Sequence, residues 1–252
     1  MKDGTSITPV DWLSHDTAIT DPSVFSVDID ASHAIMCFER VSYELVTDAL
    51  DLGKSTERPT IAGALETKSK PGMIVSRCFF GAPAAALHME ALIASGVESV
   101  LMIGEAGSIS DDCHIGDLVI PEWGIREEGT SYHYLPPEAQ CRPRGEILNE
   151  MKIGLQALHP KYGGVWTTDA GLRETRDKIL RYSKQGAIAV EMECTALMAV
   201  AMYRGIDFAA ILVITDELYQ LEWNRGFRSN LVRTTKAQLA SALSDLFRPY
   251  EE

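Results

Sequence analysis

Short apolar runs alternate with longer amphipathic runs along most of the chain. The short apolar runs predict strands, and runs whose apolar residues recur every third or fourth position predict helices. The predicted strands are 34–38, 73–80, 99–103, 117–121, 164–168, 187–190 and 208–215. The predicted helices are 40–52, 83–95, 145–158, 172–184, 191–204 and 229–247. Such alternation is typical of an α/β protein.

The predicted strand FAAILVIT, residues 208–215, is apolar at nearly every position. A strand of this kind is buried on both faces, so helices should cover both sides of the sheet. The chain has 252 residues and no internal repeat, low-complexity tract or linker, which suits one large domain. We therefore predict a single domain over residues 1–252.

The charge and composition of the chain argue against several classes of partner. The formal net charge is −13 at pH 7, which argues against nucleic acid. No apolar run is long enough to span a membrane, and the N-terminus lacks the apolar core of a secretory signal. The five cysteines include no C-x-x-C pair and the six histidines never fall at metal-ligand spacing. We expect a cytoplasmic protein with reduced thiols and no metal site.

Two glutamates interrupt the apolar stretch AIAVEMECTALMAVAMYR, residues 187–204. A buried carboxylate is costly unless a polar group pairs with it. We expect Glu191 and Glu193 to lie at the start of a helix, where the N–H groups and the helix dipole favour one acidic residue. Glu193 heads the apolar stripe of that helix, and a sugar diol would be a suitable partner for it.

Two more carboxylates lie after predicted strands. Asp216 follows strand 208–215, at the end of the sheet where α/β proteins bind ligands. A partly desolvated carboxyl there can act as a general acid, but an aspartate in this place can equally cap a helix. Glu105 lies in MIGEAGSIS, residues 102–110. The two glycines of that segment would let backbone N–H groups approach a ligand, and a tight exit from the strand explains them equally well.

Six segments, in this order, resemble the purine nucleoside phosphorylase and uridine phosphorylase superfamily, in its hexamer-forming branch. They are GAPAAALHMEALIASG (81–96), GEAGSI (104–109), GDLVIPEWGIREEGTSYHY (116–134), VWTTDAGLRET (165–175), AVEMECTAL (189–197) and ITDEL (214–218). The resemblance implies an α/β fold with a central mixed, twisted sheet. It also implies cleavage of an N-glycosidic bond, in which phosphate attacks the anomeric carbon and a nucleobase leaves.

The resemblance implies a ribose site at the two glutamates. The Met192 backbone and Glu193 would bind the ribose hydroxyls, and Glu191 would flank them. No cofactor is implied beyond inorganic phosphate as co-substrate.

The resemblance also implies a base site. Asp216 matches the aspartate that, in purine-specific members, donates a proton to the purine ring, and Thr215 replaces the serine before it. Thr168 and Asp169 would lie beside the base. The Q-x-R pair of uridine phosphorylases is missing after Asp169, where TRD (175–177) stands, so a purine is slightly favoured over uridine.

The nucleophile site departs from the family pattern. The R-x-G-[ST] motif reads MIGE over residues 102–105, with Met102 in place of the arginine and Glu105 in place of the serine or threonine. This site has lost a cation and gained an anion. The candidate phosphate-binding residues are Arg40, Gly104, Glu105, Arg126 and, as a further cation, Arg77.

Three hypotheses follow. The first is a nucleoside phosphorylase. In the second, Glu105 activates water and the protein is a nucleosidase; in the third, it is a non-catalytic nucleoside-binding homologue. The resemblance also implies a homo-oligomer, either a dimer or a hexamer of dimers, for which Tyr132, Tyr134 and Leu135 are candidate contacts.

Overall fold

The computed structural model describes residues 18–26, 28–53, 56–60 and 63–247. In this part of the chain ten strands form one sheet. The strands are β1 (Ala31–Cys37), β2 (Thr56–Thr60), β3 (Gly63–Lys70), β4 (Gly72–Arg77), β5 (Ser99–Ser108), β6 (Leu118–Arg126), β7 (Lys161–Thr167), β8 (Ala187–Glu191), β9 (Asp207–Glu217) and β10 (Asn224–Arg225). The α-helices are α1 (Arg40–Ala49), α2 (Ala82–Ala94), α3 (Glu146–Gly154), α4 (Arg176–Lys184), α5 (Cys194–Arg204) and α6 (Asn230–Leu246).

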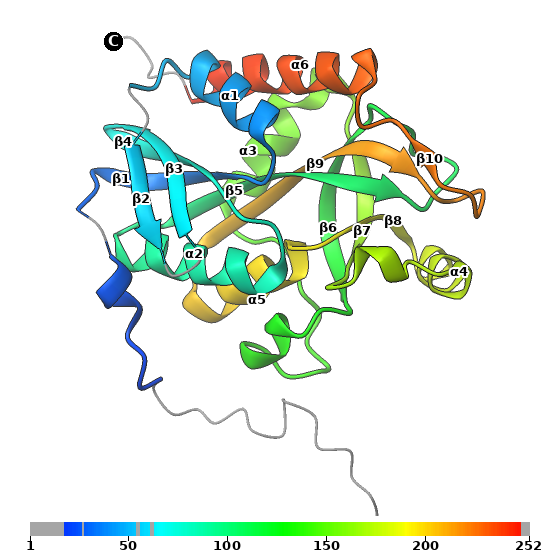
Figure 1. Cartoon of the computed structure of the whole chain (residues 1–252), viewed down its shortest axis with the longest axis horizontal. Helices are drawn as coiled ribbons and strands as arrows, with labels where there is room; N and C mark the ends of the chain where they lie inside the picture. Colours follow the sequence, from blue (N-terminus) through cyan, green and yellow to red (C-terminus); the bar gives the residue numbers. More distant parts are fainter. Residues whose placement is uncertain (1–17, 27, 54–55, 61–62, 248–252) are drawn as a thin grey trace, which may run out of the picture.

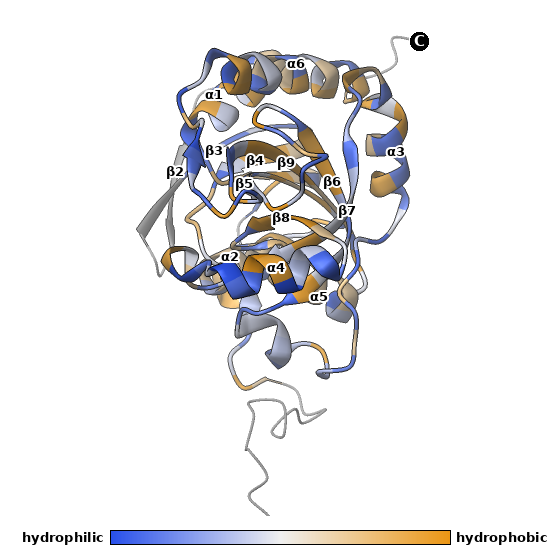
Figure 2. Cartoon of the chain, turned by 90° about the vertical axis from the view of Figure 1, so that its right-hand side faces the viewer, coloured by the Kyte–Doolittle hydropathy of each residue, from blue (hydrophilic) through white to orange (hydrophobic). Residues whose placement is uncertain are grey.

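The helices cover both faces of the sheet (Figure 1). Helices α1, α3 and α6 pack together on one face, α2 and α5 pack together on the other, and α4 lies against β8. One apolar cluster fills the space under α2 and α5, and a second fills the space under α1, α3 and α6. Figure 2 shows the apolar strands enclosed between these helix layers.

Part of the sheet closes on itself. The strand order is β10-β9-β6-β7-β8-β5-β1-β4-β3-β2, and β9 also pairs with β5. Strands β5, β9, β6, β7 and β8 therefore form a ring, from which β1, β4, β3 and β2 extend. Strand β5 runs parallel to β1 and β9 but antiparallel to β8. The prediction of an α/β fold with a central mixed sheet and helices on both faces is confirmed.

Two predicted boundaries near the site are wrong. The segment at Gly104–Ser108 is not a loop, because β5 continues through it and pairs with β9 as far as Glu217. The helix expected from Glu191 begins at Cys194, because Glu191 is the last residue of β8. These two shifted boundaries change which backbone N–H and C=O groups near the site lack a partner within a strand or helix.

The apolar pattern of the sequence does not predict three of the strands. β10 and β2 are the two end strands of the sheet order, and β3 lies next to β2. The sequences of β2, β3 and β10 are TERPT, GALETKSK and NR, which are largely polar. Edge strands are often polar because they face water on one side. Apolar patterning therefore gave no signal for them.

Within the described ranges, no helix is long and apolar enough to cross a membrane. All five cysteines are free and buried. The N-terminal segment used to judge targeting, residues 1–16, lies outside the described residues.

Candidate active site

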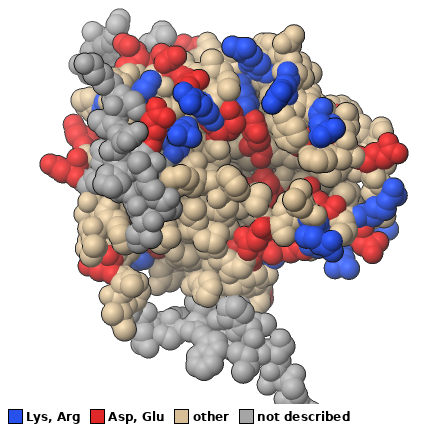
Figure 3. Space-filling view, in the orientation of Figure 1, with Lys and Arg blue, Asp and Glu red and all other residues tan. Residues whose placement is uncertain are grey.

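The carboxyl ends of β5, β8 and β9 border a cavity of about 440 Å³, within the usual range for small-molecule sites. Its lining residues are Glu105, Ala106, Gly107, Gly171, Leu172, Glu174, Val190, Glu191, Met192, Thr215, Asp216, Leu218, Trp223 and Phe227. We call this the central cavity. Figure 3 shows acidic side chains gathered in a recess on one face of the molecule, between the upper and lower helix layers.

Asp216 lies in the central cavity and is held through both carboxyl oxygens. Thr215 Oγ1 donates to Oδ1 at 3.1 Å, and Trp223 Nε1 donates to Oδ2 at 2.7 Å. Burial raises the pKa of Asp216, although these two hydrogen bonds oppose the shift. A β-carbon at position 107 would lie 2.6 Å from Leu218 Cδ1 and 3.3 Å from Asp216 Oδ2. The absence of a side chain at Gly107 thus leaves room mainly for Leu218 and, more marginally, for the Asp216 carboxyl group.

Glu105, on β5, belongs to an ion-paired cluster at the cavity lining. Lys236, on α6, is almost fully buried and its Nζ lies 2.5 Å from Glu105 Oε1 and 2.6 Å from Glu39 Oε2. The Glu39 carboxylate also accepts from the Val41 and Ser42 N–H groups at the start of α1. Although burial acts to raise it, the pKa of Glu39 is lowered by the bonds from Lys236 and these N–H groups.

The carboxylate of Glu191 is buried and engaged. Its oxygens accept from Thr167 Oγ1, from the Glu193 N–H at 2.6 Å and from the Cys194 N–H at 2.7 Å. Glu191 therefore satisfies the first N–H groups of α5 from the end of β8, as a capping carboxylate does. Thr167 in turn accepts from the Thr195 N–H at 3.0 Å. This network stabilises the strand-to-helix turn on which Met192 lies.

Glu193 is buried at the N-cap position of α5 and faces the start of α2. Its Oε1 accepts from the Gly81 N–H at 2.5 Å, so a protein group, and not only a sugar, pairs with it. The Met192 backbone also forms a hydrogen bond to this carboxylate. Glu193 does not line the central cavity, whereas the adjacent Met192 does. Burial and the charge of Glu191 raise the pKa of Glu193.

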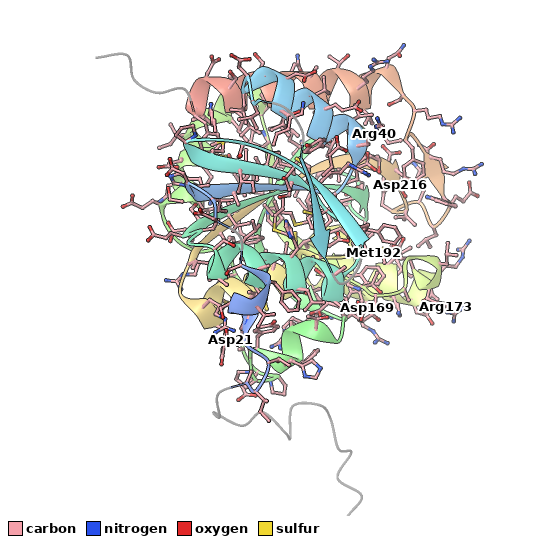
Figure 4. All side chains as sticks on the ribbon, turned by 60° about the vertical axis from the view of Figure 1, so that its left-hand side comes forward. Asp21, Arg40, Asp169, Arg173, Met192 and Asp216 are labelled. Carbon is pink, nitrogen blue, oxygen red and sulfur yellow. The ribbon has the colours of Figure 1, made fainter. Side chains whose placement is uncertain are left out.

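Thr168 and Asp169 lie after β7, away from the central cavity. The Thr168 N–H donates to the Glu191 carbonyl at 2.9 Å, and Asp169 Oδ2 accepts from the Gly129 N–H at 2.9 Å. Asp169 lines a separate hollow beside α2, together with Leu87 and His133 among others. Figure 4 shows Arg40, Asp216, Met192 and Asp169 following one another down the same side of the molecule.

The candidate arginines make other interactions. Arg40 is exposed and pairs with Glu44 at 2.7 Å, and Arg77 pairs with Glu66 at 3.2 Å. Arg126 donates to Ser131 Oγ and to the carbonyl oxygens of three residues. Those three are Leu135, Pro136 and Ala139. None of these arginines lines the central cavity.

Met102 does not reach the cavity either. It is fully buried in β5, and its Sδ lies 3.5 Å from Cys194 Sγ. Gly104 is buried in the same strand. The position where the family motif has an arginine is therefore apolar core.

Residues 42–248 match the family model of the phosphorylase superfamily. The chain belongs to this superfamily. A guanosine phosphorylase from Halorubrum lacusprofundi is 29% identical over 143 residues, which are 55% of this chain and 58% of that relative. The matched segment thus spans less than two thirds of that relative.

Solved structures share the superfamily fold. A uridine phosphorylase from Vibrio fischeri has a TM-score of 0.70 and 24% identity, covering 86% of this chain and 90% of that one. An AMP nucleosidase from Bacteroides thetaiotaomicron has a TM-score of 0.66 and 23% identity, covering 86% and 87%.

No family motif points to four residues at the central cavity: Glu174, Trp223 and Phe227 line it, and Lys236 contacts Glu105 of the lining. Lys236, Glu174, Trp223 and Phe227 lie outside the six matching segments or, for Glu174, at a position without an assigned role. For Lys236 the sequence contains one indication of a role. This residue lies at an inward position of the amphipathic run 229–247, where a lysine needs a buried partner. Trp223 and Phe227 lie in a polar segment without periodicity, so the sequence contains no indication that either residue belongs to the site.

Proposed function

We propose that the protein cleaves the N-glycosidic bond of a purine nucleoside, with water as the nucleophile. The observation that carries the proposal is the pairing of Glu105 with Lys236. Lys236 holds one carboxylate oxygen, while Glu105 lines the central cavity and its Oε2 has no partner among the described residues. That oxygen can accept a proton from water.

The charge of this end of the cavity favours water over phosphate. Lys236 is shared by two carboxylates, so the cluster of Glu39, Lys236 and Glu105 carries a net negative charge when all three are ionised. A phosphate dianion taken out of water needs several charged or N–H donors. The three candidate arginines are engaged elsewhere.

The reaction can be written with the residues of the cavity. Glu105 takes a proton from water as the water oxygen bonds to the anomeric carbon. The bond between that carbon and the base nitrogen breaks, and its electron pair stays with the base. Asp216, whose pKa is raised by burial, gives a proton to a ring nitrogen of the base. The products are ribose and the free base.

The ribose is proposed to lie across Met192 towards Glu193. The Glu193 carboxylate can accept from the sugar hydroxyls in addition to the Gly81 N–H, while Glu191 holds the turn in place. Thr215 orients Asp216 for the base. Thr168 and Asp169 act on the base only if it extends towards the hollow beside α2.

Phosphorolysis is the second candidate. Lys236 has three N–H donors and two are used within the described residues, so one remains for an anion. The guanosine phosphorylase and uridine phosphorylase named above also favour it. In this case Glu105 would have to bind a protonated phosphate.

The test is base release from adenosine, inosine, guanosine and uridine, with and without phosphate. Equal rates in both buffers support the proposal. Release only with phosphate favours phosphorolysis, and no release from any nucleoside favours a non-catalytic homologue. Glu105→Gln should abolish release, whereas the exposed control Glu44→Gln should leave it unchanged.

We further propose that the protein is a cytoplasmic homo-oligomer. Tyr132 and Tyr134 are engaged in their own fold, with Arg126 and Tyr203 respectively. The exposed side chains of Phe80 and Leu87, around the start of α2, are better candidates for contacts. Light-scattering mass tests this, and a monomer would contradict it.

A further inference from the structure

The ammonium of Lys236 is shared between two carboxylates from distant parts of the chain. It lies 2.5 Å from Glu105 Oε1, on β5, and 2.6 Å from Glu39 Oε2, just before α1. The lysine is 5% exposed and belongs to α6, which packs beside α1 (Figure 1). Of these three residues, Glu105 alone lines the central cavity. Lys236 and Glu39 can therefore act on a bound ligand only through Glu105.

The Glu39 carboxylate is fixed by the backbone at the start of α1. Its Oε1 accepts from the Val41 N–H at 2.6 Å, and its Oε2 accepts from the Ser42 N–H at 2.9 Å. These N–H groups have no partner within the helix. Although burial acts to raise it, the pKa of Glu39 is lowered by Lys236 and by these N–H groups. Glu39 therefore keeps its negative charge near neutral pH.

The turn before α1 directs an anion to the cluster, and no cation. Arg40, the residue after Glu39, is exposed and pairs with Glu44 at 2.7 Å on the surface of α1. The only positive charge bonded to Glu105 within the described ranges is that of Lys236.

The other charged and titratable groups of the neighbouring elements make no ion pair or hydrogen bond with Glu105 among the described residues. They are Arg40 on α1, Arg233 on α6, the buried Cys37 thiol at the end of β1, and the carboxyls of the cavity lining, which are Glu174, Glu191 and Asp216. Burial raises the pKa of the Cys37 thiol, so it stays uncharged. The residue opposite Glu105 on β9 is the apolar Val213. The charge next to Glu105 is thus set by Lys236 and Glu39.

The second carboxylate changes the effect of Lys236 on Glu105. An ammonium paired with one carboxylate favours its ionised form and makes it a weaker base. Because Glu39 contacts the same nitrogen, its negative charge offsets part of the positive charge that Glu105 meets. Glu105 is thereby held in place and still attracts a proton, as a general base must.

We propose that Glu39 is a positioning residue for the reaction: through Lys236 it fixes the Glu105 carboxylate and preserves its basicity. The residue that caps α1 would then contribute to catalysis without touching the substrate. This inference rests on the proposed function, since it concerns the group that takes the proton from water.

Two variants should move the pH dependence of the rate in opposite directions. In Glu39→Gln the amide oxygen can still accept from the start of α1 but the charge is lost. The midpoint of the acidic limb of kcat/KM for adenosine should therefore fall by about 0.5–1 pH unit. In Lys236→Met two carboxylates meet without a cation, and the midpoint should rise by about 1–2 pH units. Glu44→Gln, an exposed control on the same helix, should leave it unchanged.

A capping role alone predicts a different result. It would lower the stability of Glu39→Gln and leave the midpoint in place. In our account KM for adenosine changes by less than about twofold in Glu39→Gln, because Glu39 does not line the cavity, and kcat carries the effect. A midpoint that is unmoved or raised in folded Glu39→Gln would overturn the inference.

Titration of Glu105 itself tests the inference without turnover. Carbon-13 NMR of glutamate-labelled protein, with Glu105→Gln to assign the signal, should show this carboxyl titrating at lower pH in Glu39→Gln than in the wild type. In Lys236→Met it should titrate at higher pH. If these shifts are found but the wild type releases no base without phosphate, the proposed function fails and the control of Glu105 by Glu39 is supported. Identical titration of Glu105 in the wild type and Glu39→Gln would overturn it.

Discussion

The Lys236 ammonium lies 2.5 Å from the Glu105 carboxylate, across 131 positions of sequence. This bond joins the C-terminal helix α6 to the strand β5 at the place where the superfamily motif has a serine or threonine. The carboxylate of Glu39 lies 2.6 Å from the same ammonium, so the start of α1 is joined to them. The acidic residue at this position of the motif is therefore paired with a buried cation.

Replacing Lys236 should destabilise the protein. In Lys236→Met two carboxylates face each other without a cation, and we expect a loss of about 2–3 kcal/mol in the free energy of unfolding. This is below the about 3–5 kcal/mol for breaking a fully buried pair, because Glu39 and Glu105 are 26% and 29% exposed. Urea denaturation measures the loss. Arg40→Met, at an exposed pair, should change it by less than about 0.5 kcal/mol; equal losses in the two variants would contradict the assignment.

Replacing Asp216 should affect only substrates whose leaving group needs a proton. Asp216→Asn should lower kcat on a purine nucleoside by about a hundredfold or more. It should spare a p-nitrophenyl riboside, whose phenolate leaves without protonation. Steady-state kinetics on both substrates make the comparison. A similar loss on the two would mean that Asp216 supports the fold or the sugar and is not the acid.

Substitutions at Glu191 and Glu193 should have different effects, one on stability and the other on substrate binding. Glu191→Gln removes a carboxylate that accepts three hydrogen bonds, so it should cost about 2–3 kcal/mol of stability. Glu193→Gln should instead raise KM for a ribonucleoside about tenfold and change KM for the 2′-deoxynucleoside much less. Thermal melts and kinetics on both sugars would show the difference. An equal rise of KM for both sugars would rule out recognition of the diol by Glu193.

Sequence patterning predicted the core of the fold but not its edges. The strand FAAILVIT was evident because its burial on both faces leaves an apolar run, whereas polar edge strands such as β10 leave none. Glu193 and Asp216 were evident because acidic residues beside apolar strands need an explanation. Lys236 and Trp223 were not assigned, because their roles depend on contacts with Glu105 and Asp216 that lie far away in sequence or follow an irregular turn.

The stability of the protein should depend on pH through Glu174. The pKa of this group is raised from 4.5 to about 7, so the folded state binds more protons than the unfolded state between these values. Its contribution is complete below about pH 4.5 and is lost as the pH rises through about 7. Relative to Glu174→Gln, the wild type should therefore lose about 1–2 kcal/mol over this range, less than the full shift implies because the group is partly solvated. Urea denaturation at several pH values measures this, and a constant difference between the two proteins would refute it.

The nucleophile is tested most directly by the sugar product formed in the presence of saturating phosphate. Mass spectrometry of the products of adenosine cleavage should find free ribose and no ribose 1-phosphate, since Glu105 directs water and the cluster with Lys236 repels a dianion. Ribose 1-phosphate as the main product, with no cleavage when phosphate is left out, would contradict the account.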